Sequence, residues 1–497
     1  MFGLIEKELE NVGITENGAV GYKTAGSHLV DINYQISSLR NETEEYIRDL
    51  FEKAYFENPK YALKWLFFAR DAREGIGERR LFRICYKKLA ELNEDAFIKN
   101  LINIQEFGRY DDLVNMIGIN YTIDMKIIEI IKKQLNDDLQ NLENGKGISL
   151  LAKWMPSENA SSKNTKALAK KIRKMLKMSP KTYRVMLSKL RAYSDVVEVK
   201  TCKNKWDEIN YENVPSMANL RYKNAFLRHD RERRVAYLES VMEGNKKMNM
   251  SVATPVDIVT RYDSWFVREE DQTLETAWKN LKNVGIKDTL VVADGSGSMT
   301  IEVSGRTTAL DVANSLAIYT SERNTGVYKN KYITFSSRPQ FVSFKEDDSL
   351  QQKLKTAREH NEISNTNIKA VFDLILQIAV MNRVPKEEMI KNILIISDME
   401  FDRAQGGFGR DVEILSNSLF NVIKDDYAKY GYKLPKLIFW NVNSRTKTIP
   451  LIENELGVTL VSGFSQNVLQ MVMSNKYDPY EVLVDTITRE RYEKIKL

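Results

Sequence analysis

The spacing of apolar positions changes near residue 285 of the chain. Before that point, apolar residues recur every three or four positions, and polar turns separate one run from the next. Short amphipathic helices of this kind are typical of stacked helix pairs, so we expect a HEAT-like helical-repeat domain over residues 1–285. Helices are predicted at 61–70, 78–89, 95–105, 111–117 and 124–142.

After residue 285, short apolar runs alternate with helical patterns. This alternation predicts a parallel-dominated sheet with helices on both faces, and hence a doubly wound domain over residues 286–475. The fold class is therefore multidomain, α plus α/β. Residues 476–497 read as too polar for a core helix, and we expect this tail to pack back on the helical domain. Strands are predicted at 289–293, 331–335, 340–344, 393–397, 437–441 and 458–462, and helices near 308–322, 368–382, 412–429 and 465–474.

Polar side chains follow three segments of the predicted sheet domain. Two apolar strands each end in an acid, and a polar loop lies directly before a helical pattern between them. Because the carboxyl ends of parallel strands meet at one edge, these side chains could converge on one hard cation, Mg²⁺ or else Mn²⁺ or Ca²⁺. Asp-Gly-Ser-Gly is also ordinary turn chemistry, so both interpretations stay open. The candidate ligands are Asp294, Ser296, Ser298, Thr366 and Asp398.

Composition narrows the class of protein. With 43% hydrophobic and 29% charged residues, the chain is typical of a globular protein, and no run of about 18–20 apolar residues predicts a membrane span. Acids near the N-terminus argue against a signal peptide, and two cysteines cannot form a disulfide framework, so we expect a cytoplasmic protein. The three histidines are scattered and no phosphate-binding or nucleophile motif occurs, so we do not expect an enzyme.

Positive charge is concentrated in one part of the chain. Residues 146–247 contain 24 Lys and Arg against 10 Asp and Glu, a net charge of +14, although the whole chain carries only +6. Such a surface could bind a polyanion, and the aromatics Trp154, Tyr183, Tyr193, Trp206 and Tyr222 could stack on unpaired bases. Solvated helix faces with aromatics in the core are the alternative. The candidate nucleic-acid-binding residues are Lys153, Lys163, Lys166, Lys170, Lys171, Arg173, Lys174, Lys177, Arg221, Lys223 and Arg228.

Two segments of the helical region allow more than one interpretation. In residues 70–80, the arginines could grip phosphates, or Asp71 and Glu78 could hold them in structural salt bridges, which we favour. Residues 153–163 form a loop that leads into a basic helix, and helix N-terminal amides with lysines make an anion site. Glu158 in this loop argues mildly against that role.

The ordered set of candidate metal ligands resembles the metal-ion-dependent adhesion site of von Willebrand factor A domains. The resemblance covers about residues 286–475 and implies an ion with an open coordination position, often filled by a partner's carboxylate. Ser364 and Asn365 stand where that family usually has glycine, so the second loop departs from the pattern. A helical-repeat domain before such a domain is similar to the TROVE family, the Ro ribonucleoprotein autoantigens, whose helical ring binds RNA. The chain is closer to a TROVE-like family of bacteria, plants and large viruses, through residues 22–31, 67–80, 107–113, 153–163 and 397–402.

These observations predict an RNA-binding protein, a Ro-like ribonucleoprotein component, with a divalent-metal adhesion site. Its expected partners are structured or single-stranded non-coding RNA and an acidic protein ligand at the metal. The alternative is a metal-dependent protein-interaction scaffold that does not bind nucleic acid. A metal-dependent phosphodiesterase would need a second metal or a general base, for which Glu400 is the nearest candidate.

Overall fold

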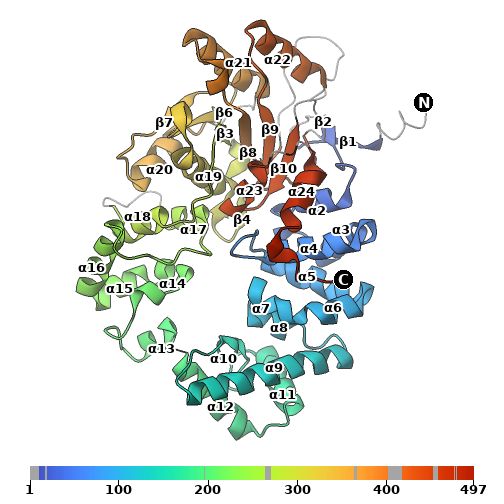
Figure 1. Cartoon of the computed structure of the whole chain (residues 1–497), viewed down its shortest axis with the longest axis vertical. Coiled ribbons are helices and arrows are strands. Elements are labelled where there is room, and N and C mark those ends of the chain that lie inside the picture. Colours follow the sequence, from blue (N-terminus) through green and yellow to red (C-terminus); the bar gives the residue numbers. More distant parts are fainter. Residues whose placement is uncertain are drawn as a thin grey trace. The chain divides into compact units, whose positions relative to one another are not determined.

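The computed structural model describes residues 10–16, 20–194, 196–262, 270–362, 367–400, 417–450, 457–474, 476 and 478–497. As expected, a helical region is followed along the chain by a mostly parallel sheet with helices (Figure 1). The compact units do not follow the linear boundaries expected at residues 285 and 475, however. Unit 1 consists of Met1–Ala62 and Ala253–Arg489, and unit 2 consists of Leu63–Val252 and Glu490–Leu497.

The sheet of unit 1 has the strand order β10-β9-β8-β3-β6-β7. All neighbouring strands are parallel except β6 and β7, which are antiparallel and form the hairpin expected at residues 331–344. Every residue of β3 and β9 is buried, because these are central strands with apolar runs and helices cover the sheet. The strands are β3 (Thr289–Asp294), β6 (Lys331–Phe335), β7 (Phe341–Ser343), β8 (Asn392–Ser397), β9 (Lys436–Asn441) and β10 (Val458–Ser462).

The helices of unit 1 pack mainly against this sheet. The predicted helix at 308–322 is α19, which contacts β3, β6 and β8, whereas α2 and α24 contact β10. The helices are α2 (His28–Tyr34), α3 (Glu44–Glu57), α17 (Pro255–Val259), α18 (Gln272–Lys279), α19 (Ala309–Arg323), α20 (Leu350–Glu359), α21 (Ile368–Met381), α22 (Asn417–Lys429), α23 (Leu469–Val472) and α24 (Pro479–Ile487). The short 3-10 turns of this unit are η1 (Ser38–Arg40), η4 (Gly297–Thr300), η5 (Gly326–Tyr328), η6 (Lys386–Glu388) and η7 (Gln466–Val468). Two small antiparallel pairs lie outside the main sheet, β1 (Val12–Ile14) with β2 (Val20–Tyr22) and β4 (Glu302–Ser304) with β5 (Thr307–Thr308).

The N-terminal segment belongs to unit 1 because it bonds to segments far along the chain. Tyr22 exchanges two backbone hydrogen bonds with Ile449, each of 2.8 Å. The side-chain amide of Asn441 donates to the carbonyl of Tyr34 at 2.9 Å, which joins the end of β9 to α2. Local patterning predicts neither contact, because the partners are more than 400 residues apart in sequence.

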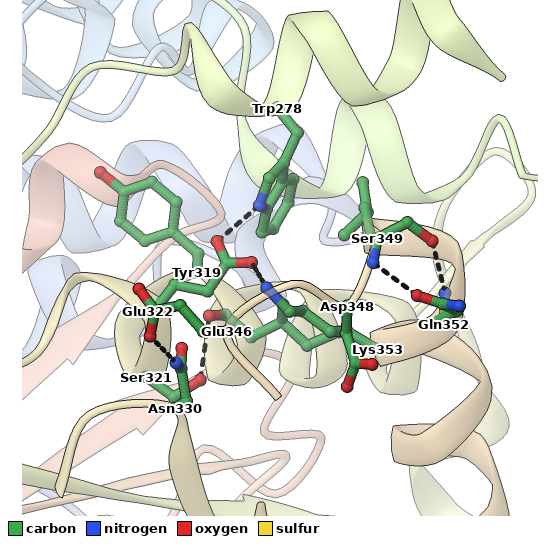
Figure 2. A network of polar contacts seen from close by, with 12 residues as sticks. Trp278, Tyr319, Ser321, Glu322, Asn330, Glu346, Asp348, Ser349, Gln352 and Lys353 are labelled. Carbon is green, nitrogen blue, oxygen red and sulfur yellow. Dashed lines mark hydrogen bonds and ion pairs between the residues drawn. The ribbon is translucent and has the colours of Figure 1, made fainter. Parts of the chain in front are cut away.

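A buried charged network attaches α18 and α20 to α19 (Figure 2). Glu322 accepts hydrogen bonds from the Trp278 indole N–H at 2.6 Å and from the Lys353 ammonium at 2.7 Å. Arg323 lies 3.1 Å from the same carboxylate and 3.9 Å from the centre of the Tyr319 ring. Since Lys353 is only 6% exposed, Glu322 is the group that makes its burial tolerable.

The regular secondary structure among the described residues of unit 2 is helical. Four of the five predicted helices agree with observed ones within three residues at each end, whereas the helix predicted at 95–105 is divided into two short helices and a 3-10 turn. The helices of unit 2 vary in length. They are α4 (Pro59–Arg70, which begins in unit 1), α5 (Arg79–Leu92), α6 (Glu94–Asn100), α7 (Ile104–Phe107), α8 (Tyr110–Asn115), α9 (Tyr121–Glu143), α10 (Leu151–Trp154), α11 (Lys163–Met175), α12 (Pro180–Tyr193), α13 (Val197–Cys202), α14 (Ser216–Arg221), α15 (Lys223–His229) and α16 (Arg231–Met242), with the turns η2 (Leu101–Asn103), η3 (Tyr211–Asn213) and η8 (Glu490–Tyr492).

Within the arginine-rich motif at 70–80, Arg70 has a structural role with a partner outside the motif, whereas Arg79 and Arg80 are exposed. Arg70 and Arg83 both bind the carboxylate of Asp112, which is fully buried, at distances of 2.7–2.9 Å. Gly108 is needed beside this cluster, because a Cβ there would lie 2.6 Å from an Asp112 oxygen. The motifs at 67–80 and 107–113 therefore lock together through buried ion pairs.

The C-terminal tail divides between the two units. Residues 479–487 form α24, whose Val482, Leu483 and Ile487 are buried in unit 1, because these residues form an apolar stripe at helical spacing. The expectation that the whole tail is too polar for a core helix is therefore wrong for this segment. Residues 490–497 belong to unit 2, where the Arg491 guanidinium binds the buried carboxylate of Asp71, one of the bonds being 2.9 Å long.

In the part of the chain that the structure describes, no helix is both long enough and apolar enough to cross a membrane.

Candidate metal centre and nucleic-acid interface

The two acids predicted as metal ligands lie at the carboxyl edge of the sheet, after neighbouring strands. Asp294 is the last residue of β3, and Asp398 directly follows β8. Because β3 pairs with β6 on one side and with β8 on the other, the strand order reverses here. Open α/β sheets bind their ligands at such a topological switch point.

Hydrogen bonds connect the candidate ligands of the first and third loops. Asp294 accepts the backbone N–H of Ser296 at 2.9 Å and the hydroxyl of Ser397 at 2.6 Å. The hydroxyl oxygens of Ser296 and Ser298 are 3.0 Å apart, and the Ser298 side chain bonds in turn to Asp398. The structure thus brings Asp294, Ser296, Ser298 and Asp398 into one cluster.

Asp398 is held in an environment that disfavours its negative charge. Burial, and after it the charge of Asp294, raises the pKa of Asp398 to about 7, although the hydrogen bond from Ser298 acts in the opposite direction. The side chain is 1% exposed, and its Oδ2 atom accepts no hydrogen bond among the described residues. The next residue, Met399, has a φ of 62°, a left-handed conformation that is uncommon outside glycine and clusters at functional sites.

The donor set fits a hard divalent cation. Two buried carboxylates that face each other are costly without a cation, and an oxygen without a hydrogen bond is free to coordinate one. Among the described residues, no group of three or more His, Cys, Asp or Glu side chains could hold a metal ion. An ion at Asp294 and Asp398 would therefore complete its coordination with hydroxyl oxygens and water.

The second predicted loop is described only at its borders. Thr366 lies outside the described residues. The segment before it passes closely over the first loop, because a Cβ on Gly295 would lie 3.1 Å from the Cα of Asn361. After the loop, Asn367 caps α21 by accepting the backbone N–H of Ala370 at 3.0 Å.

Sequence reasoning named one of the groups beside Asp398, Glu400, but missed the other, Arg445. Glu400 does not resemble a free general base, because its carboxylate accepts backbone N–H groups of Glu16, Arg445 and Thr446 at 2.7–2.9 Å. The Arg445 guanidinium forms ion pairs with Asp398, at 3.6 Å, and with Glu16. No local pattern marks Arg445, since it reaches the site from the loop after β9.

The basic helix of unit 2 presents a stripe of lysines to solvent. Lys163, Lys166, Lys170 and Lys174 follow one another at three- and four-residue spacing on α11, and Lys177 continues the series just beyond its end. Lys166 is half-buried and the others are exposed. Within the described part of the chain, none of these five side chains forms an ion pair with an acid. We call these five residues the α11 stripe.

Three other predicted cations are already neutralised. Lys153 pairs with Glu198 at 3.2 Å, and Lys171 pairs with Asp124 at 2.6 Å. Arg173 pairs with Glu158 at 2.7 Å and also donates to the carbonyl of Met178. The loop at 153–163 is thus occupied by internal contacts, and the hydroxyl of Ser162 caps α11 itself. The geometry favours the α11 stripe over this loop as an anion-binding surface.

The remaining predicted cations lie on α14 and α15, away from α11 in sequence. Arg221 and Arg228 are exposed, and Lys223 is half-buried. On α12, Lys181 and Arg184 are exposed at three-residue spacing without an ion pair to a described acid, and the same charge pattern could have identified them.

Most of the aromatics proposed for base stacking are engaged within the protein. Tyr183 is 1% exposed and donates to the carbonyl of Pro156, so its proposed role is wrong. The Arg109 guanidinium covers the ring of Trp154 at 4.2 Å, and Trp206 stacks on His229 with ring centres 4.4 Å apart. Tyr193 is 37% exposed, whereas Tyr222 is half-buried.

Comparison with known proteins finds a family model that matches each part of the chain. Residues 15–129 and 121–288 match a domain of unknown function, DUF2828, and residues 288–495 match a second one, DUF7788. The chain belongs to the DUF2828 family. It is also 30% identical to an uncharacterised protein of Acanthamoeba polyphaga mimivirus, over 96% of this chain and 88% of the viral protein. None of these descriptions names a ligand, a partner or a reaction.

Proposed function

We propose that this protein binds RNA through the backbone phosphates, with the α11 stripe of unit 2 as the contact surface. The observation that carries this proposal is the set of lysines on one solvent-facing helix stripe without acidic partners among the described residues. Each phosphate that a lysine neutralises releases condensed counterions, which drives binding regardless of sequence. Paired residues such as Lys171 contribute less, because an anion must first displace Asp124.

Two further observations support a phosphate-binding mode. The net charge of +14 over residues 146–247 attracts a polyanion from a distance. Burial of Tyr183 and the internal stacking of Trp206 leave few aromatic platforms for bases. The resemblance to TROVE ribonucleoproteins, whose helical repeats bind RNA, favours RNA over DNA and suggests a HEAT-like repeat organisation of unit 2.

The test measures RNA binding by the full-length protein at several salt concentrations. A fluorescently labelled single-stranded RNA and a labelled hairpin are titrated with wild-type protein and with the K170E/K174E variant. The matched control is K132E/K133E, which changes the net charge equally at two exposed positions of α9. Losing two phosphate contacts should make the negative slope of log K against log salt shallower by about 1.4 for a single strand. The control should keep the wild-type slope.

Each outcome of this test decides something different. If the wild type binds neither RNA, the proposed function is wrong. If both variants lose affinity equally, only net charge matters and the α11 stripe is not the contact surface. If a single-stranded DNA of the same sequence, titrated in the same way, binds with equal affinity, the proposed ligand becomes nucleic acid in general.

We also propose that the sheet edge of unit 1 is a von Willebrand factor A-like adhesion site that binds Mg²⁺, Mn²⁺ or Ca²⁺. Asp294, Ser296, Ser298 and Asp398 would hold the ion, together with Thr366. The Asp398 oxygen that accepts no hydrogen bond supports this proposal. A cation there would offer an open coordination position to a carboxylate of an acidic partner.

The second candidate function is a cation-dependent protein-interaction scaffold without nucleic-acid binding. The buried acid pair favours it, because that cluster does not depend on the basic helix. Asp294→Ala separates the two ideas: we expect it to abolish cation binding and leave RNA affinity intact if the sites act independently. Loss of both would reveal coupling between them.

We propose no reaction for this protein. The Glu400 carboxylate, the nearest candidate base, accepts three backbone N–H groups and is 3% exposed, which supports a structural role. Neither Cys85, which is buried, nor Cys202, which is exposed, forms a disulfide bond, which is consistent with the cytoplasmic location that we propose.

A further inference from the structure

Arg445 stands between a buried and an exposed carboxylate. Its Nη1 atom lies 3.6 Å from Oδ2 of Asp398, the oxygen that accepts no hydrogen bond. Its Nη2 atom forms an ion pair with Glu16, whose side chain is 57% exposed. The guanidinium therefore contributes positive charge to the candidate metal centre from outside the set of ligands.

The contact with Asp398 is close enough for charge attraction but too long for a good hydrogen bond. An arginine that binds a carboxylate well forms two parallel bonds of about 2.7–2.9 Å. Here Nη1 and Nε of Arg445 are buried and have no hydrogen-bond partner among the described residues. Glu400 holds the backbone of Arg445 by accepting its N–H at 2.7 Å, and leaves the guanidinium to the two acidic partners.

We propose that Arg445 is a tethered counter-cation that competes with the divalent ion for Asp398 and so sets the affinity of the site. Without the ion, Arg445 partly neutralises Asp398. When the ion binds, the guanidinium is repelled and pairs with Glu16 alone. This inference rests on the proposed cation site, and it assigns roles to two residues outside the set of ligands.

Charge arithmetic gives the direction and the size of the effect. A single positive charge acting on a divalent ion over roughly 6 Å, at an effective dielectric constant of about 20, weakens binding by more than tenfold. Replacing Arg445 with methionine removes this repulsion and keeps the aliphatic part of the side chain. Replacing Glu16 with glutamine has the opposite effect, because the guanidinium then loses its alternative partner and stays near Asp398.

The experiment measures Mn²⁺ binding to the full-length protein by calorimetry and by electron paramagnetic resonance of free Mn²⁺, at about pH 8 where carboxylates are ionised. We expect Arg445→Met to lower the dissociation constant at least tenfold and Glu16→Gln to raise it several-fold. Arg445→Lys, which keeps the charge, should remain near the wild type. A purely structural role for Arg445 predicts the reverse, since damage to the loop weakens binding.

The outcomes separate this inference from the proposed site. If the wild type and Arg445→Met both fail to bind Mn²⁺, the cation site itself is wrong. If the wild type binds and Arg445→Met binds equally or more weakly, the site stands and the role of Arg445 is overturned. Circular dichroism of each variant checks its fold, and Glu16→Gln keeps the inference testable should Arg445→Met not fold.

Discussion

In a chelating buffer at about pH 8, we expect the Asp398→Asn variant to unfold at a higher temperature than the wild-type protein. The pKa of Asp398 is about 7 in the folded protein, against 3.8 for a free aspartate side chain. Between these two values the folded state binds a proton that the unfolded state has lost, so the stability of the wild type falls as pH rises through this window. Asparagine cannot ionise and removes that loss.

The magnitude follows from the size of the pKa shift. About three pH units at 1.4 kcal/mol each give a destabilisation of about 4 kcal/mol above pH 7. We expect roughly 2–4 kcal/mol to be recovered, because asparagine also alters the hydrogen bonds to Ser298 and Glu400. At about 2 °C for each kcal/mol in a unit of this size, the unfolding temperature should rise by roughly 4–8 °C.

Thermal unfolding followed by circular dichroism at about pH 5 and pH 8, with chelator or with excess Mg²⁺, measures this effect. Mg²⁺ should raise the unfolding temperature of the wild type and leave Asp398→Asn unchanged, because a ligand stabilises only a state that binds it. Asp347→Asn, at an exposed position of the same unit, is the matched control and should behave as the wild type. A lower unfolding temperature for Asp398→Asn in chelator at pH 8 would refute the reasoning.

Three further substitutions test buried ion pairs and hydrogen bonds within the units. Glu322→Ala should lower the free energy of unfolding in urea by about 3–5 kcal/mol, because it leaves the Lys353 ammonium buried without this carboxylate. A Glu322→Gln, Lys353→Met double variant lacks the buried charge and should be more stable than Glu322→Ala; equal stability of the two would contradict this reasoning. Arg491→Met should lower the free energy of unfolding by about 2–4 kcal/mol, since the Asp71 carboxylate loses this cation, and it should expose the last eight residues to carboxypeptidase. Arg491→Lys keeps the charge and should restore part of the protection from carboxypeptidase. Glu400→Gln should speed amide exchange in residues 445–446, and unchanged exchange would show that its carboxylate is not what holds that loop.

Local sequence patterns were sufficient for the six strands of the main sheet. The apolar runs that end at Asp294 and Asp398 form adjacent parallel strands, as the alternation with helices predicted. The stripe on α11 is likewise local, because helical spacing alone brings Lys170 and Lys174 onto one face. Such features depend on neighbours within a few residues and on the repeat of a strand or a helix.

Local patterns failed where a side chain depends on a distant partner. The same helix carries Lys170, which has no acidic partner among the described residues, and Lys171, which binds Asp124 on α9. Their charges are identical in the sequence, and only the packing of α11 against α9 distinguishes them. The expectation that the tail is too polar for a core helix failed at α24 for the same reason, because β10 and α2 cover its short apolar stripe.

The sequence by itself therefore determined the helical region, the sheet and the two acids at the ends of its strands, since these follow from periodicity and from the rule that parallel strands share an edge. Only the tertiary structure decided which charges are compensated. Arg445 approaches Asp398 from a loop 47 positions away in sequence, and the other acidic partner of Arg445, Glu16, is 429 positions away from it. Ion pairs need a few ångströms of space and no particular separation along the chain, so no local pattern can predict them.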